Sequence, residues 1–95
     1  MSKVISIGRN VKGIPMTWKD WDMFKNELML LIEKHEENEI HFVGEGTGIY
    51  EGQTEQSFTV IFSGQIDGLP LLATRFDQDA IALTVGITKF IQGGN

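Results

Sequence analysis

The chain has 95 residues, of which 41% are hydrophobic, which is enough for one domain with a single core and too few for two. Thirteen acidic residues against eight Lys and Arg give a formal net charge of −5, so the average field of the protein repels a nucleic-acid backbone. The chain contains no Cys, which excludes disulfides, thiolate catalysis and sulfur-ligated metals.

The first predicted element is a short, central strand over residues 3–7, because this stretch is apolar and β-branched and ends at Gly8. Residues 9–15 are then expected to form a loop. It carries two cations, Arg9 and Lys12, close together in an otherwise acidic chain. Two interpretations stay open for them: pairing with nearby acidic side chains, or contact with a bound anion.

An amphipathic helix is predicted to begin after Thr17, whose side chain can cap the exposed amides of the first turn. Apolar side chains then recur at steps of three and four residues, as on one face of a helix. The residues on this face are Trp18, Trp21, Phe24, Leu28, Leu31, Ile32 and, at the end, His35. We expect this helix to run for about five turns and to end near Asn38.

A β-hairpin is predicted over residues 39–65. Phe58, Val60 and Phe62 fall on one face of an extended chain, and Ser57, Thr59 and Ser63 fall on the other, which is the two-residue period of a half-buried strand. The run 40–43 is its expected partner strand. Between them, residues 44–56 contain four glycines and read as a long loop, and loops of this length in compact domains are usually functional or mobile.

Two further elements follow the hairpin. Residues 69–76 predict two turns of helix with Pro70 in the first turn. Residues 80–90 alternate between apolar and small side chains and predict a strand. The alternative is a long C-terminal helix over 77–91, but the run Thr84–Thr88 is a poor helix former.

The predicted fold is therefore α+β. The order strand, helix, strand, strand, helix, strand indicates a ferredoxin-like βαββαβ domain over residues 1–95, an antiparallel sheet with both helices on one face. The other sheet face would carry small, nearly uncharged side chains around Thr59 and Thr84, with His41 and Val43 nearby. A face of this kind suits close approach by a second sheet or a ligand, so we expect a homo-oligomer.

The sequence contains no recognisable catalytic or metal-binding set. Neither of the two His residues belongs to a Ser-His-Asp arrangement, and the loop glycines match neither a P-loop nor a dinucleotide fingerprint. His41 with Glu45, Glu51 or Glu55 matches no metal-ligand spacing, so no metal or cofactor is predicted. One of these three glutamates could still serve as a general base in an enzyme.

One set of polar residues indicates a binding site. It combines two guanidinium groups, an ammonium group, amides, an aromatic ring and carboxylates, which together suit a small anionic, nucleotide-like ligand. The candidate ligand-binding residues are Arg9, Asn10, Lys12, Tyr50, Glu51, Glu55, Gln56, Arg75, Gln78 and Asp79.

In an acidic chain without Cys, the segments 44–52 and 76–86 resemble small uncharacterised phage and prophage proteins. This resemblance implies an anti-defence protein that sequesters a nucleotide signal in an oligomer. The order of strands and helices is also similar to that of acylphosphatase-like proteins. Their activity is not carried over, because the loop around Arg9 has a different spacing of Gly and Gln.

The favoured function is thus an oligomeric binding protein that holds its ligand without turning it over. One alternative is a small enzyme that acts on a similar ligand, and another is a protein-inhibiting module whose Trp- and Met-rich helix is the contact surface. No membrane contact or nucleic-acid polymer is expected. The short apolar run at the N-terminus does not predict a signal peptide, so we expect a cytoplasmic protein, in the host cytoplasm if it is phage-encoded.

Overall fold

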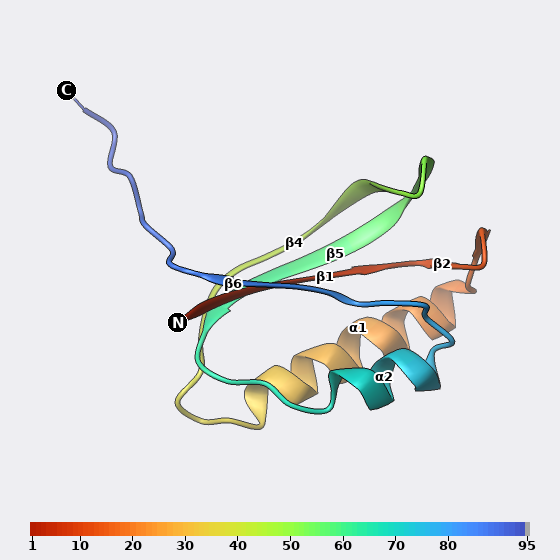
Figure 1. Ribbon diagram of the computed structural model, residues 1–95, viewed down its shortest axis with the longest axis horizontal. Coiled ribbons are helices and arrows are strands. Elements are labelled where there is room, and N and C mark those ends of the chain that lie inside the picture. The colour runs from red at the N-terminus through yellow and green to blue at the C-terminus, as the bar shows by residue number, and fades with distance from the viewer. Residues whose placement is uncertain (95) are drawn as a thin grey trace.

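The computed structural model describes residues 1–94 as one layer of strands and one layer of helices (Figure 1). Six strands and two helices follow one another along the chain. Their bounds are β1 Ser2–Gly8, β2 Asn10–Val11, β3 Ile14–Pro15, α1 Trp18–Glu33, β4 Glu39–Tyr50, β5 Gln53–Ser63, α2 Leu69–Arg75 and β6 Ala82–Gly86.

Four of the strands form one antiparallel sheet in the order β4-β5-β1-β6. β1 lies in the middle, with Ile5 opposite Val60 of β5 on one side and opposite Leu83 of β6 on the other. β2 and β3 pair only with each other, as a small second sheet directly after β1.

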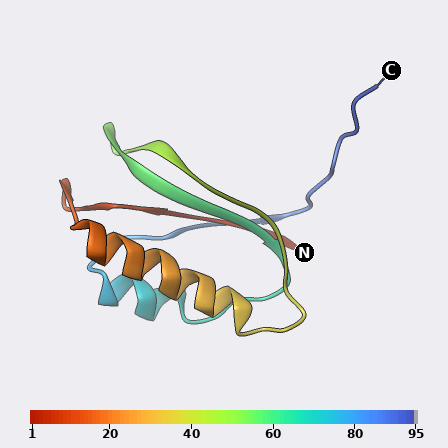
Figure 2. The same cartoon turned by 180° about the vertical axis from the view of Figure 1, so that it is seen from behind.

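The core lies between the four-stranded sheet and the helices, which both run along the same side of it (Figures 1 and 2). Because side chains alternate along a strand, every second residue of β1 and β5 points into this layer. The buried residues are Ile5, Ile7, Phe58, Val60 and Phe62 from the sheet, and Trp21, Phe24, Leu28, Ile32 and Leu72 from the helices.

The structure confirms that α1 begins after Thr17 and that most of the predicted apolar face of the helix is buried. The Thr17 side chain accepts a hydrogen bond from the amide of Asp20 at 3.2 Å, which satisfies a free donor of the first turn. The helix ends at Glu33, earlier than predicted. Asn38 instead donates its side-chain amide to the carbonyl of Ile32 at 2.8 Å and so caps the helix end from outside. Among the described residues, neither helix has the length and apolar character needed to span a bilayer.

The ferredoxin-like βαββαβ fold predicted from the sequence is wrong. The chain is mostly β, with six strands in two sheets and the order βββαββαβ. The difference arises in part in residues 9–15, which were expected to be a loop. There Lys12 and Gly13 have φ angles of 49° and 82°, and a two-residue turn with positive φ at both positions folds β3 back onto β2.

The long glycine-rich loop predicted over residues 44–56 is also wrong. β4 continues to Tyr50 and β5 begins at Gln53, so only Glu51 and Gly52 connect them, with φ angles of 49° and 79°. Three of the glycines lie inside β4, and two of them, Gly44 and Gly48, leave room for neighbouring side chains. A Cβ on Gly44, for example, would meet the Phe42 ring at 2.6 Å.

Two smaller differences lie at the sheet edges. A β-bulge between Ile40 and Phe42 shifts the register of β4, so Val43 lies opposite Val60 and faces the helix side instead of the outer side. The last strand covers only residues 82–86 of the predicted 80–90, and it is a strand rather than the alternative helix.

Burial along α1 predicts which side chains hold the two layers together. Leu28 is fully buried, whereas Leu30 on the same helix is 64% exposed. Leu28→Ala should lower the free energy of unfolding by about 2–5 kcal/mol, because it removes buried methyl groups and leaves a cavity. Leu30→Ala is the matched control and should change stability by less than about 0.5 kcal/mol in urea unfolding. Equal losses in the two variants would contradict the placement of α1.

Candidate functional site

The outer face of the sheet, opposite the helices, contains a cavity of about 520 Å³ at the end where the hairpin turns lie. Small residues form its floor because Ser6, Ser57 and Ala82 point outward from three neighbouring strands. Gly8 and Gly48 add no side chain at all. The floor is therefore low enough for a ligand to approach the backbone of the sheet.

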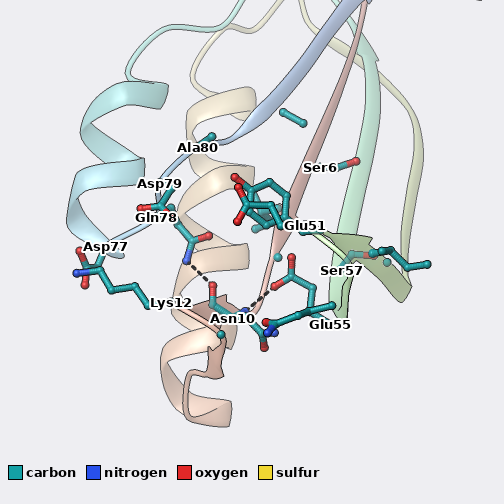
Figure 3. Close-up of a pocket in the computed structure, with 18 residues that line it drawn as sticks. Ser6, Asn10, Lys12, Glu51, Glu55, Ser57, Asp77, Gln78, Asp79 and Ala80 are labelled. Carbon is teal, nitrogen blue, oxygen red and sulfur yellow. Dashed lines mark hydrogen bonds between the residues drawn. The ribbon is translucent and has the colours of Figure 1, made fainter.

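Three connections rise around this floor as walls (Figure 3). They are the β2–β3 turn, the β4–β5 turn and the loop from α2 to β6. Each contributes a non-glycine residue with positive φ: Lys12 at 49°, Glu51 at 49° and Asp77 at 54°, and no others occur among the described residues. A positive φ costs energy in a residue with a side chain, so the surrounding structure must hold these three in place, and such strained positions cluster at ligand sites.

Glu55 is the best-oriented side chain of the cavity. Its Oε2 accepts a hydrogen bond from the backbone amide of Asn10 at 2.7 Å. The carboxylate lies directly over Gly8, where a Cβ would come within 2.1 Å of Oε1. Gly8 is thus needed for this side chain to lie flat across the floor, and the bond to Asn10 fixes its direction.

On the opposite wall, Gln78 is held by the backbone. Its side-chain amide donates to the carbonyl of Asn10 at 3.4 Å and to the carbonyl of Phe76 at 3.3 Å. In Figure 3, Glu51 lies between the wall with Gln78 and Asp79 and the wall with Glu55. Acceptors therefore approach the centre of the cavity from three sides.

The pKa of Tyr50 reflects the negative charges around the cavity. The negative charge of Glu51 raises the pKa of the Tyr50 hydroxyl, with further contributions from partial burial and from the charges of Asp79 and Glu55. The lining holds four carboxylates, those of Glu51, Glu55, Asp77 and Asp79, and one ammonium group, that of Lys12. Its formal charge is −3, so the cavity attracts hydrogen-bond donors and cations more than anions.

Seven of the ten residues predicted to bind a ligand line this cavity, although they come from four separate segments. They are Asn10, Lys12, Tyr50, Glu51, Glu55, Gln78 and Asp79. The other three, Arg9, Gln56 and Arg75, do not line it.

Arg9 has structural partners in this fold. Its guanidinium group lies 3.6 Å from the centre of the Trp18 ring and donates to the carbonyl of Met16 at 2.8 Å. A second nitrogen donates to Oε1 of Gln56 at 2.8 Å. Arg9 therefore links the start of α1 to β5, and its Nε and Nη1 groups both donate hydrogen bonds within the protein.

Arg75 lies on the helix layer, away from the cavity. Its Nε forms an ion pair with Oε2 of Glu27 on α1 at 3.1 Å. The two arginines thus do not converge on one anion site as they stand in the structure.

Sequence reasoning missed several residues of the cavity floor and rim. These are Ser6, Gly8, Gly48, Gln53, Ser57 and Asp77. The available signal is the alternation of glycines at 44, 46 and 48, which has the two-residue period of a strand, although glycine-rich segments also occur in loops. The described residues contain no group of three or more potential ligands placed to hold a metal ion.

Comparison with known proteins adds nothing to the geometry. A scan against protein-family models, a search of curated proteins and a search of solved structures each found no significant match to this chain. Functional inference therefore rests on the cavity itself.

The single tyrosine of the chain allows its environment to be measured directly. Absorbance of the phenolate should give a Tyr50 pKa above the ordinary value of about 10. Because the folded pKa is the higher one, any stabilisation from Tyr50 is present below pH 10 and is lost as the pH rises through the folded pKa. Glu51→Gln should move the pKa back toward 10. An unchanged pKa in this variant would contradict the contact.

The contacts of Arg9 predict a structural role that can be separated from binding. Arg9→Lys keeps the charge but loses the fork and the stack on Trp18, and should lower the free energy of unfolding by about 1–2 kcal/mol. Arg75→Lys at the exposed ion pair should lower it by less than about 1 kcal/mol. Urea unfolding of both variants checks this, and the reverse order of losses would contradict it.

Proposed function

We propose that this protein binds a small nucleoside-like ligand in the cavity on the outer sheet face and does not turn it over. The observation that supports this most directly is the fixed Glu55 carboxylate, held by the amide of Asn10 over Gly8 inside a cavity of about 520 Å³. Small-ligand pockets commonly have volumes in this range and a few oriented polar groups.

The chemistry of the walls supports a ligand that combines a ring with several donors. Tyr50 offers an aromatic surface, and the carboxylates of Glu51, Glu55 and Asp79 accept hydrogen bonds from hydroxyl or amino groups. Ribose hydroxyls and the exocyclic amino group of a base are donors of this kind. The proposal therefore concerns the nucleoside part of the predicted ligand.

That the ligand also carries a negatively charged group stays a prediction. Within the described lining, Lys12 is the only cationic side chain, and a phosphate group would lie among four carboxylates. An anti-defence role in a phage, assembly as a homo-oligomer and a cytoplasmic location are likewise part of the proposal. The absence of Cys fits the reducing cytoplasm.

Catalysis is the second candidate, because a held carboxylate can also act as a general base. Nucleosides and their monophosphates, incubated with the purified protein and recovered after denaturation, separate the two functions. Intact compound that was retained by the folded protein supports binding. A changed compound whose formation is lost in Glu55→Gln supports catalysis and contradicts the proposal.

Glu55→Gln also tests the binding site directly. Loss of a charge-assisted hydrogen bond of about 1.5–3 kcal/mol should weaken nucleoside binding roughly ten- to a hundredfold in calorimetric titration. Glu39→Gln on β4 is the matched control, because Glu39 lies outside the cavity lining, and it should bind as the wild type does. Equal affinity in Glu55→Gln and wild type would remove Glu55 from the site. Tighter binding of the monophosphates than of the nucleosides would favour the anionic ligand.

A further inference from the structure

The two edges of the main sheet differ in how well they are protected from other strands. β4 carries Glu39 and Glu45 and a bulge between Ile40 and Phe42, and charges and bulges on an edge hinder pairing with another chain. β6 forms the other edge, and its sequence Ala-Leu-Thr-Val-Gly has no charge, no Pro and no recorded bulge. Its outer side pairs with no strand among residues 1–94.

The side chains of β6 are also incompletely covered. Leu83 and Val85 face the helix side but remain 43% and 49% exposed, and Ile87 just beyond the strand is 83% exposed. Figure 1 shows β6 at the sheet margin, with the chain continuing beyond it in an extended path. Apolar side chains and free backbone groups thus occur together along one edge, which is a template for strand addition.

The sequence around β6 is complementary to itself. In antiparallel pairing about a two-fold axis at Thr84, Leu83 lies opposite the partner's Val85, and Ala82 lies opposite the partner's Gly86. After Gly86 the chain leaves this edge, because the Thr88 amide donates to Ser2 Oγ and the Phe90 ring packs against His41 of β4. The paired segment, residues 82–86, carries no charged side chain, so no like charges oppose each other across the two-fold axis.

We propose that two copies of this chain pair through their β6 edges, antiparallel and centred on Thr84, to form one continuous eight-stranded sheet. Pairing buries Leu83 and Val85 and satisfies the outer backbone groups of β6. It leaves the cavity floor open, whereas a second sheet laid across the outer face would cover it.

The register can be tested with single cysteines, because the chain has none of its own. Opposing residues in antiparallel strands have Cα atoms about 4.5–5.5 Å apart, which is within the range for a disulfide. Thr84→Cys should therefore give a covalent dimer under mild oxidation, at a rate at least about tenfold above that of Ala82→Cys.

Ala82→Cys is the matched control, since residue 82 is on the same strand and the same face but lies opposite the partner's Gly86. Thr59→Cys, on the outer face of β5, tests the face-to-face alternative. Failure of Thr84→Cys to cross-link, equal rates for residues 82 and 84, or preferred cross-linking through residue 59 would each overturn the proposal.

Sedimentation provides a second test that needs no disulfide. Val85→Lys places a charge on the paired edge and should shift a wild-type dimer to monomer at about 100 μM protein. Val43→Lys makes the same change on the β4 edge, where Val43 is similarly exposed at 46%, and should leave the dimer intact. Far-UV circular dichroism must show that both variants are folded. A wild type that sediments as a monomer, or a dimer lost only in Val43→Lys, would contradict the β6 interface.

Discussion

The inward orientation of Phe58, Val60 and Phe62 is the constraint on which the rest of the structure depends. These side chains are buried against α1, and the two-residue period of a strand then forces their neighbours Ser57 and Thr59 outward. The hydrogen-bonded register carries the same alternation into the other strands of the sheet. Which residues lie on the outer face is therefore a consequence of how the core packs, and at the turn end, around Ser6 and Ser57, these residues are small and polar.

The cavity is walled at one end of this face by two two-residue turns, at Lys12–Gly13 and Glu51–Gly52, and by the longer connection from α2 to β6. Lys12, Glu51 and Asp77 adopt positive φ angles, and each wall consequently rises close to the sheet. The walls bring together carboxylates that are distant in sequence. Their mutual repulsion is relieved in part by fixed donors, such as the Asn10 amide that holds Glu55. A ligand that donates hydrogen bonds would relieve it further.

Binding and assembly use different parts of the same sheet. The cavity occupies the outer face near the turns, and the proposed interface occupies the β6 edge, so one need not block the other. They meet at the start of β6, where Asp79 lines the rim of the cavity and Ala82 lines its floor. The opposite edge is protected by Glu39, Glu45 and a bulge, which favours a closed dimer over an open filament.

The sequence by itself determined the start and buried face of α1, the core strand around Val60 and the short helix α2, because local periodicity and capping decide these features. It also pointed to seven residues of the cavity. Only the tertiary structure decided that β4 and β5 are long strands joined by Glu51 and Gly52, and that a second small sheet replaces the predicted ferredoxin-like order. Glycines in a strand and in a loop look alike in sequence, and only the partner strand distinguishes them. The structural role of Arg9 likewise appears only in the tertiary structure, because it depends on contacts with Trp18 and Gln56.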